Sequence, residues 1–193
     1  MALFPPGNDN ALRASKAMRS ELDTYNRHRG SCGYEPIEFG IGIHAGSVMM
    51  GTVGESRRMD TTVISDVVNL AARLENLTKL LHTRVLVSKS SLGSFAEIPS
   101  RFVGRVKIKG KKELIEVCEL LFEKLKIETL PLFNQAMNHF EEGSFMEAEE
   151  SFSAVFAINS DDYIAGLYLR KSVIARKMPE SLPDLQFIDM EQI

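Results

Sequence analysis

The sequence predicts an α+β fold in which helices pack on a mixed sheet, followed by a short all-helical segment. Three observations support this class. Strand-like and helix-like patterns are interleaved over residues 1–121. Residues 102–109 and 114–121 read as the two strands of a hairpin around a polar turn. Beyond residue 121 the apolar residues recur at helical spacing, which divides the chain into an α+β part and an all-α part.

The first residues read as the end of a strand. Residues 1–4 are mostly apolar, and the Pro5-Pro6 pair is a turn signal that stops the strand. A strand that starts part-way along its length predicts further elements upstream, in a longer parent protein. Residues 10–29 then place apolar side chains on one face of a helix, which ends at Gly30.

A strand with unusual glycines is expected next. Residues 37–50 alternate in polarity and are rich in β-formers. Gly40 and Gly42 lie within this stretch, where a missing side chain allows another element to approach closely. Gly51 and Gly54 predict a turn at the end of the strand.

A second helix is expected after a short β-branched strand at residues 61–64. Ser65 or Asp66 would cap its start. Its apolar stripe continues to about residue 81, and a further strand follows at residues 84–88. The second helix is therefore predicted to lie between two strands of the α+β part.

Composition changes after residue 121, and the chain is expected to divide there. Residues 122–129 are predicted to be a charged linker, residues 130–178 a helical segment, and residues 179–193 an extended tail without clear period. Five phenylalanines are expected to attach the helical segment to the rest of the chain: Phe133, Phe140, Phe145, Phe152 and Phe156.

The helical segment resembles a tetratricopeptide-like helical pair with one more helix. The resemblance rests on the small residues Ala136, Gly143 and Ala148, and on the turn Ser160-Asp161-Asp162. Because a single repeat of this kind does not bury its own apolar face, the segment is expected to pack against the main domain or against a partner.

Composition narrows the classes of function. The formal net charge of -3 lacks the basic excess of proteins that bind nucleic acid. No apolar run approaches the roughly 20 residues of a membrane-spanning helix, so no membrane contact is expected from this chain, although a longer parent protein could be anchored. Cys32 and Cys118 form neither a metal motif nor a disulfide framework, and they indicate a reducing, cytoplasmic setting.

Two motifs carry chemical information. Residues 68–75 read Val-Asn-Leu-Ala-Ala-Arg-Leu-Glu, and residues 109–111 read Lys-Gly-Lys. In this order and at this distance, with the glycine-rich residues 40–46 before them, they resemble the class III adenylyl and guanylyl cyclases. The resemblance covers roughly residues 1–121. It implies a truncated, ferredoxin-like nucleotidyl cyclase domain in which helices pack on a mixed sheet.

Asn69 and Arg73 are the candidate catalytic residues. They are four positions apart in a predicted helix and therefore share a face. The planar fork of an arginine matches phosphate oxygens, so this face suits a polar, anionic ligand. The cyclase resemblance implies that Asn69 orients the ribose. It also implies that Arg73 stabilises charge on the α-phosphate as the 3′-hydroxyl attacks and pyrophosphate leaves.

The resemblance also implies two substrate-binding residues. Lys109 matches the lysine that contacts the triphosphate, and Lys111 is close enough in sequence to be confused with it. Thr62 stands where the family places a base-discriminating residue, and a threonine there favours ATP over GTP. The implied reaction converts ATP into cyclic AMP and pyrophosphate in intracellular signal transduction.

The family holds two metal ions, Mg²⁺ or Mn²⁺, with a pair of aspartates that lie upstream of the part matched here. The resemblance therefore implies that the metal ligands are not in this chain and that the isolated chain is inactive. The family site forms at a dimer interface, where one subunit supplies the aspartates and the other supplies the Asn, Arg and Lys set. A homodimer is expected, and exchange of elements across an open sheet edge is one form of it.

Other interpretations stay open. One alternative is a guanylate cyclase, and another is a degenerate cyclase-like module whose helical segment binds a protein partner. Asn69 and Arg73 also fit an ordinary exposed helix face, and the alternating lysines around Lys109 fit a solvated strand edge. The presence of all three residues together favours the enzyme. A diguanylate cyclase is not supported, because the sequence has no Gly-Gly-Asp/Glu-Glu-Phe turn.

Overall fold

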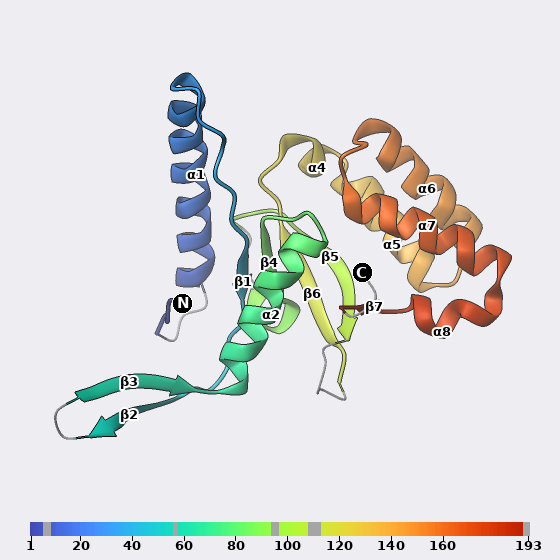
Figure 1. The fold of residues 1–193 in the computed structure, drawn as a ribbon. Coiled ribbons are helices and arrows are strands. Elements are labelled where there is room, and N and C mark those ends of the chain that lie inside the picture. Colours follow the sequence, from blue (N-terminus) through green and yellow to red (C-terminus); the bar gives the residue numbers. More distant parts are fainter. Residues whose placement is uncertain (6–8, 56–57, 94–96, 108–112, 191–193) are drawn as a thin grey trace.

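The computed structural model describes residues 1–5, 9–55, 58–93, 97–107 and 113–190. Five strands form its central sheet: β1 (Ile41–Ile43), β4 (Val85–Ser88), β5 (Ser100–Lys107), β6 (Ile115–Leu120) and β7 (Ile188–Asp189). Their order across the sheet is β1-β4-β6-β5-β7 (Figure 1). β1 and β4 are parallel, β6 is antiparallel to both β4 and β5, and β7 is parallel to β5. The sheet is therefore mixed, as predicted.

Helices cover both faces of the sheet. α1 (Asp9–Ser31) lies on one face, where Leu12 packs with Val85, Val87 and Cys118. The other face carries four helices that share one apolar core with the strands. These are α2 (Asp66–Leu80), α5 (Leu130–Glu141), α6 (Phe145–Ile158) and α7 (Tyr163–Lys177). The predicted α+β class is confirmed. Among the described residues, no helix combines the length and the apolarity that a membrane crossing needs.

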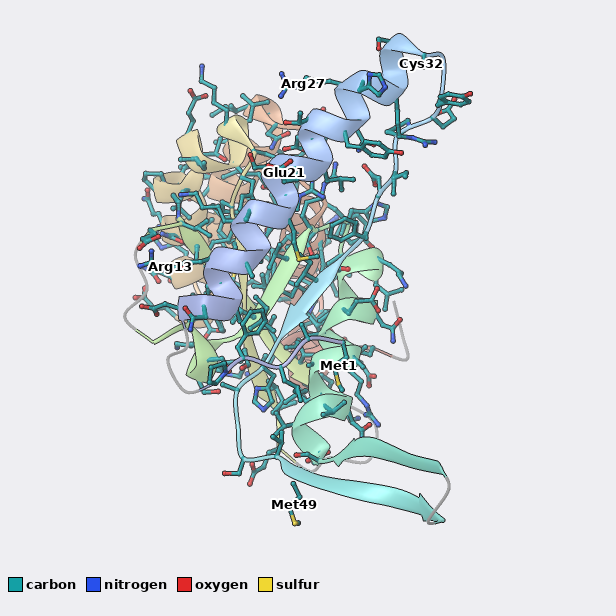
Figure 2. All side chains as sticks on the ribbon, turned by 90° about the vertical axis from the view of Figure 1, so that its left-hand side faces the viewer. Met1, Arg13, Glu21, Arg27, Cys32 and Met49 are labelled. Carbon is teal, nitrogen blue, oxygen red and sulfur yellow. The ribbon has the colours of Figure 1, made fainter. Side chains whose placement is uncertain are left out.

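A separate two-stranded hairpin projects from the main sheet. It consists of β2 (Met49–Glu55) and β3 (Arg58–Ile64). Figure 2 shows Met49, where the hairpin starts, at the opposite end of the molecule from Cys32, which follows α1. The turn predicted at Gly51 and Gly54 is wrong, because both glycines lie inside β2, opposite Thr62 and Met59. Backbone pairing with a β-branched partner strand is sufficient to keep these glycines extended.

A buried ion-pair network fastens the helical segment to the sheet. Arg101 on β5 donates to both carboxylate oxygens of Asp162, the residue that caps α7, at 2.5 and 2.8 Å. Its Nε donates to Glu119 on β6 at 2.8 Å, and Lys126 donates to the other oxygen of Glu119 at 2.7 Å. The Arg101 guanidinium also lies over the Phe133 ring, 4.2 Å from its centre.

Pairing keeps these buried groups charged. Burial by itself lowers the pKa of Arg101, but the Glu119 and Asp162 carboxylates outweigh burial and leave the pKa raised. Burial by itself raises the pKa of Asp162, but the hydrogen bonds and charge of Arg101 leave that pKa lowered. Both groups are therefore ionised at neutral pH, and each depends on the other for its stability.

The helical patterns predicted after residue 130 form α5, α6 and α7. Phe133 and Phe152 are fully buried and contact each other edge to face, and Phe140 is also buried. Phe145 and Phe156 are partly buried. These helices share their core with the sheet. The domain division at residue 121 and the tetratricopeptide likeness stay predictions.

Two stretches contain more secondary structure than predicted. The expected linker at 122–129 includes the short helix α4 (Lys124–Glu128). The expected extended tail at 179–193 is wrong in its described part, which forms η1 (Pro179–Ser181) and α8 (Leu182–Leu185) before β7. Proline is favoured in the first turn of a helix, and Lys171 of α7 binds carbonyl groups of this stretch, so local and tertiary effects both oppose an extended chain.

Arg19, on the sheet-facing side of α1, is buried without a full set of partners. The residue is 5% exposed and makes one bond of 3.3 Å to Asp23. Its Nε and Nη1 atoms have no hydrogen-bond partner within the described ranges. Burial, and then the charge of Arg84, lower its pKa.

Replacing Arg19 with methionine should therefore stabilise the chain. Methionine fills space of similar length without donors, and an unsatisfied buried polar group costs about 1–3 kcal/mol. We expect the free energy of unfolding, measured in urea, to rise by about 1 kcal/mol. Arg27→Met, an exposed change on the same helix, should alter it by less than about 0.5 kcal/mol. A clear loss of stability in Arg19→Met would show that the guanidinium is well paired.

Candidate active site

The first turns of α2 present the two candidate catalytic residues. Ser65, one of the two predicted caps, starts the helix: its hydroxyl accepts from the Val67 N–H at 3.2 Å and donates to the Ser47 carbonyl at 3.0 Å. Asn69 is exposed and Arg73 is partly buried. Because they are one turn apart, both lie on one flank of the helix, beside the leucines that face the sheet.

Two glycines determine how closely α2 lies on β1. A Cβ atom at Gly42 would collide with the α2 backbone at Ala71, and one at Gly40 would collide with Thr78. The close approach predicted at these glycines is confirmed. The earlier glycine, Gly40, lies against the later α2 residue, Thr78, and Gly42 lies against Ala71. The helix therefore runs antiparallel to the strand and begins near the strand's carboxyl end.

The strand register brings a second part of the chain to the same end of the sheet. Ile43 lies beside Val87 in the parallel pair of β1 and β4, and Val87 lies beside Cys118 in the antiparallel pair of β4 and β6. The carboxyl end of β1 is therefore at the end where β5 stops and β6 begins. Strands β4 and β6 lie between β1 and β5, so β1 and β5 are about 14 Å apart across the sheet. Asn69 and the end of β5 thus lie at one end of the sheet.

The structure describes the side chains of only two of the four predicted site residues. Asn69 and Arg73 come together on α2. Thr62 belongs to β3, where its backbone pairs with Gly51 close to the point at which the strand leads into α2, but its side chain is not among those described. Lys109 lies outside the described residues, two positions after Lys107, where β5 ends. The roles of Thr62 and Lys109 stay predictions.

The structure contains a cluster of hydroxyl groups near the site that the sequence did not predict. His44 Nδ1 lies 2.7 Å from Ser88 Oγ, which lies 2.6 Å from Ser91 Oγ. Ser91 Oγ also accepts from the Ala45 N–H at 2.7 Å. The cluster ties the chain after β1 to β4 and to the short helix α3 (Lys89–Leu92), which supports a structural role for His44. The polar run Ser88-Lys89-Ser90-Ser91 was the available signal in the sequence.

The family of the chain follows from its match to a sequence model. The model described as the adenylate and guanylate cyclase catalytic domain matches residues 10–119. The chain belongs to this family. The matched range begins in α1, ends in β6 and includes all four predicted site residues, whereas α5, α6 and α7 of this cyclase-family chain lie beyond it.

Two relatives of this cyclase-family chain carry adenylate cyclase names. It is 44% identical over 130 residues to the adenylate cyclase of Anabaena cylindrica, a match that covers 62% of this chain and 26% of the relative. It is 28% identical over 188 residues to the terminal-differentiation specific adenylate cyclase of Dictyostelium discoideum, with 90% of this chain and 9% of the relative covered. The second match extends into the segment after residue 121. The chain thus spans about a quarter or less of these relatives' length.

Solved cyclase structures also match the chain. The guanylyl cyclase Cya2 is 28% identical with a TM-score of 0.49, over 61% of this chain and 62% of that chain. A bacterial light-regulated adenylyl cyclase is 29% identical with a TM-score of 0.46, over 64% of this chain and 37% of that chain.

Proposed function

We propose that this chain supplies the nucleotide-orienting half of an adenylate cyclase site, a lyase that converts ATP into cyclic AMP and pyrophosphate in intracellular signal transduction. The observation that supports it most is the position of Asn69 and Arg73, one turn apart on one flank of α2, in a member of the cyclase family. The names of the Anabaena cylindrica and Dictyostelium discoideum relatives favour the adenylate form.

The two residues act on different parts of the nucleotide. The Arg73 guanidinium offers a planar fork of N–H donors to phosphate oxygens. Its charge matters most as negative charge develops on the α-phosphate during attack by the 3′-hydroxyl. The Asn69 amide both donates and accepts hydrogen bonds, so it can hold the ribose with the attacking hydroxyl directed at phosphorus.

The cyclase resemblance implies that a pair of aspartates upstream of the matched part holds the two metal ions. Among the described residues, no group of three or more His, Cys, Asp or Glu side chains could hold a metal ion. We assign the ligands of Mg²⁺ or Mn²⁺ to an upstream segment of a longer parent protein. These ions would neutralise phosphate charge.

We propose that the site is shared between the subunits of a homodimer. One subunit would supply the metal-binding carboxylates, and the other would supply Asn69, Arg73 and Lys109. In the described part of the chain, β1 pairs with β4 and with no other strand, so its outer edge is open to a further strand. We place the protein in the cytoplasm, since Cys32 and Cys118 are both free thiols.

ATP is the preferred substrate in this proposal, on the identity of Thr62. A guanylate cyclase is the second candidate, because the family name covers both activities. A protein-interaction module is less favoured, because the apolar faces of α5, α6 and α7 are already used against the sheet.

A chimeric enzyme tests the proposal. The part of the Anabaena cylindrica adenylate cyclase that precedes the matched region is joined to this chain, and products are measured by liquid chromatography. We expect cyclic AMP from ATP, with GTP turned over at least roughly tenfold more slowly, because base-reading hydrogen bonds discriminate strongly. The isolated chain should give no product above a heat-killed control.

Three other results would change the proposed function. Equal or faster turnover of GTP would move the assignment to a guanylate cyclase. A folded, dimeric chimera without either product would support the interaction module. Cyclic AMP from the isolated chain would contradict the assignment of the metal ligands to an upstream segment.

A further inference from the structure

A cavity of about 350 Å³ lies where the end of α2 meets the turn between α6 and α7. Figure 1 shows the carboxyl end of α2 directed toward the start of α7. The walls of the cavity include His82, just after α2, and Phe156, Asp161, Tyr163 and Arg170 from α6, α7 and the turn between them. His82 is inside the range that the cyclase family matches, whereas the other four follow that range. The cavity is therefore built jointly by the family domain and the helical segment.

The cavity is separate from the candidate active site. Asn69 lies in the first turns of α2, whereas His82 lies just beyond its last residue. A helix rises about 1.5 Å per residue, so these two residues are about 20 Å apart along the helix axis. A ligand in the cavity would therefore not occupy the space in front of Asn69 and Arg73.

His82 occupies a backbone position that favours glycine. Its φ is 51°, in the left-handed region. The His82 N–H donates to the Lys79 carbonyl at 3.4 Å. The Thr83 N–H donates to the Thr78 carbonyl at 2.9 Å, and the two bonds end α2 as a Schellman motif, where glycine is the usual residue at this position. A histidine here points to a use for its side chain, which stacks on the Tyr163 ring with 4.7 Å between ring centres.

The cavity also offers one cation and one carboxylate. The Arg170 guanidinium lies 5.8 Å from the centre of the Tyr163 ring, and its Nη1 is 3.6 Å from the place that a Cβ of Gly166 would take. The missing side chain of Gly166 thus leaves room for Arg170 to lie along α7. Arg170 and Asp161 are both exposed, and neither has an ion pair or a side-chain hydrogen bond with another described residue. Both charges are available to a ligand.

We infer that this cavity binds a nucleoside monophosphate. The rings of His82, Phe156 and Tyr163 suit a flat heteroaromatic base, because every base has a face that stacks on aromatic side chains. The planar fork of Arg170 matches the oxygens of a phosphate, and the Asp161 carboxylate can accept from a ribose hydroxyl. One cation beside a carboxylate does not neutralise a triphosphate, so the cavity favours one phosphate over three. The site is independent of the proposed cyclase reaction, because it uses none of the residues assigned to it.

Calorimetric titration of the full chain with AMP tests this site. Arg170→Gln removes the cation and Tyr163→Leu removes the central ring, while Lys177→Gln removes an exposed cation at the end of the same helix and is the matched control. His82→Gly is a second ring variant in case Tyr163→Leu does not fold, since glycine is favoured at a φ of 51°. Arg73→Ala is included to exclude binding at the candidate active site.

We expect AMP to bind the unmodified chain with a dissociation constant below about 1 mM. Arg170→Gln should raise it at least about tenfold, because charge-assisted hydrogen bonds to the phosphate are lost. Tyr163→Leu should raise it about tenfold and His82→Gly about threefold, through lost stacking. Adenosine and inorganic phosphate should each bind at least about tenfold more weakly than AMP, since each makes only one of the two kinds of contact. Lys177→Gln and Arg73→Ala should leave AMP binding unchanged.

The contrary results separate this site from the proposed function. If Arg73→Ala abolishes AMP binding and Arg170→Gln leaves it intact, AMP occupies the candidate active site, which overturns the cavity and supports the proposed function. If Arg170→Gln has no effect, or adenosine binds as tightly as AMP, the phosphate contact is wrong and the nucleotide assignment is overturned. Absence of measurable AMP binding by the unmodified chain would overturn it as well, and the chimera would still decide the proposed function.

Discussion

An Asp162→Ala chain should lose about 3–5 kcal/mol of unfolding free energy. The substitution leaves the Arg101 guanidinium, whose side chain is 0% exposed, without the carboxylate that binds two of its nitrogens. It also removes the cap of α7, since the Asp162 side chain accepts from the Ala165 N–H at 3.2 Å. Glu119 still pairs with Arg101, but the buried network then holds two cations, Arg101 and Lys126, for one carboxylate. A buried charge that is not balanced is far more costly than the complete network, which is the reason for so large an effect.

Urea unfolding at pH 7 measures this loss, with Asp161→Ala as the control. Asp161 is the preceding residue and is exposed, so its replacement should change the unfolding free energy by less than about 0.5 kcal/mol. An Asp162→Ala loss below about 1 kcal/mol would show that the network does not fasten α7 to the sheet.

The ion pair of Asp162 and Arg101 also predicts how the unfolding free energy depends on pH. The pKa of Asp162 is lowered in the folded chain, so its contribution is fully present above the unfolded value of about 3.9 and is lost as pH falls through the lower folded value. The stability difference between the unmodified chain and Asp162→Ala should therefore be constant from pH 7 to about 5 and shrink below about pH 4. A difference that vanished already at pH 6 would contradict the ion pair.

In the chimera, Arg73→Ala should lower kcat by about 10²–10³. Its charge is needed mainly where negative charge develops, so the loss should appear in kcat far more than in KM. Asn69→Ala should lower kcat as well, because a ribose held loosely presents its 3′-hydroxyl less often in line with phosphorus. Steady-state kinetics with ATP measure both parameters.

Two residues further along α2 provide matched controls. Lys79→Ala removes a cation and Asn76→Ala removes an amide from the same helix, and both side chains are exposed. Neither should lower kcat more than about twofold. A rise in KM without a fall in kcat for Arg73→Ala would show that the guanidinium only binds ATP and does not stabilise the transition state.

Local patterns were sufficient to predict α2 and its contact with β1. The leucines of α2 recur at helical spacing, Ser65 precedes them as a cap, and Gly40 and Gly42 mark the close approach. The same spacing predicts that Asn69 and Arg73 share one face of the helix, whereas their catalytic roles come from the cyclase resemblance and stay predictions. The turn at Gly51 and Gly54 failed because glycine signals a turn only when no partner strand holds it extended, and here β3 does.

Sequence patterns were not sufficient to predict contacts between residues that lie far apart in the chain. Arg101 and Asp162 are 61 positions apart, and each alone resembles an ordinary surface charge. β7 is two residues long and has no period of its own, so its pairing depends on Lys171 and on the free edge of β5. Such features arise from tertiary contacts, which override local preference.

The most direct test of the shared site mixes two chimeras that are each almost inactive. One carries Arg73→Ala. The other keeps Arg73 and lacks the metal-binding aspartates of its upstream segment. When equal amounts are dissociated and reassociated, half of the dimers are mixed and each mixed dimer has one intact site. We expect recovery of about a quarter of the activity of the unmodified chimera. No recovery, although differently tagged subunits are shown to form mixed dimers, would contradict the assignment of Arg73 to a site shared between subunits.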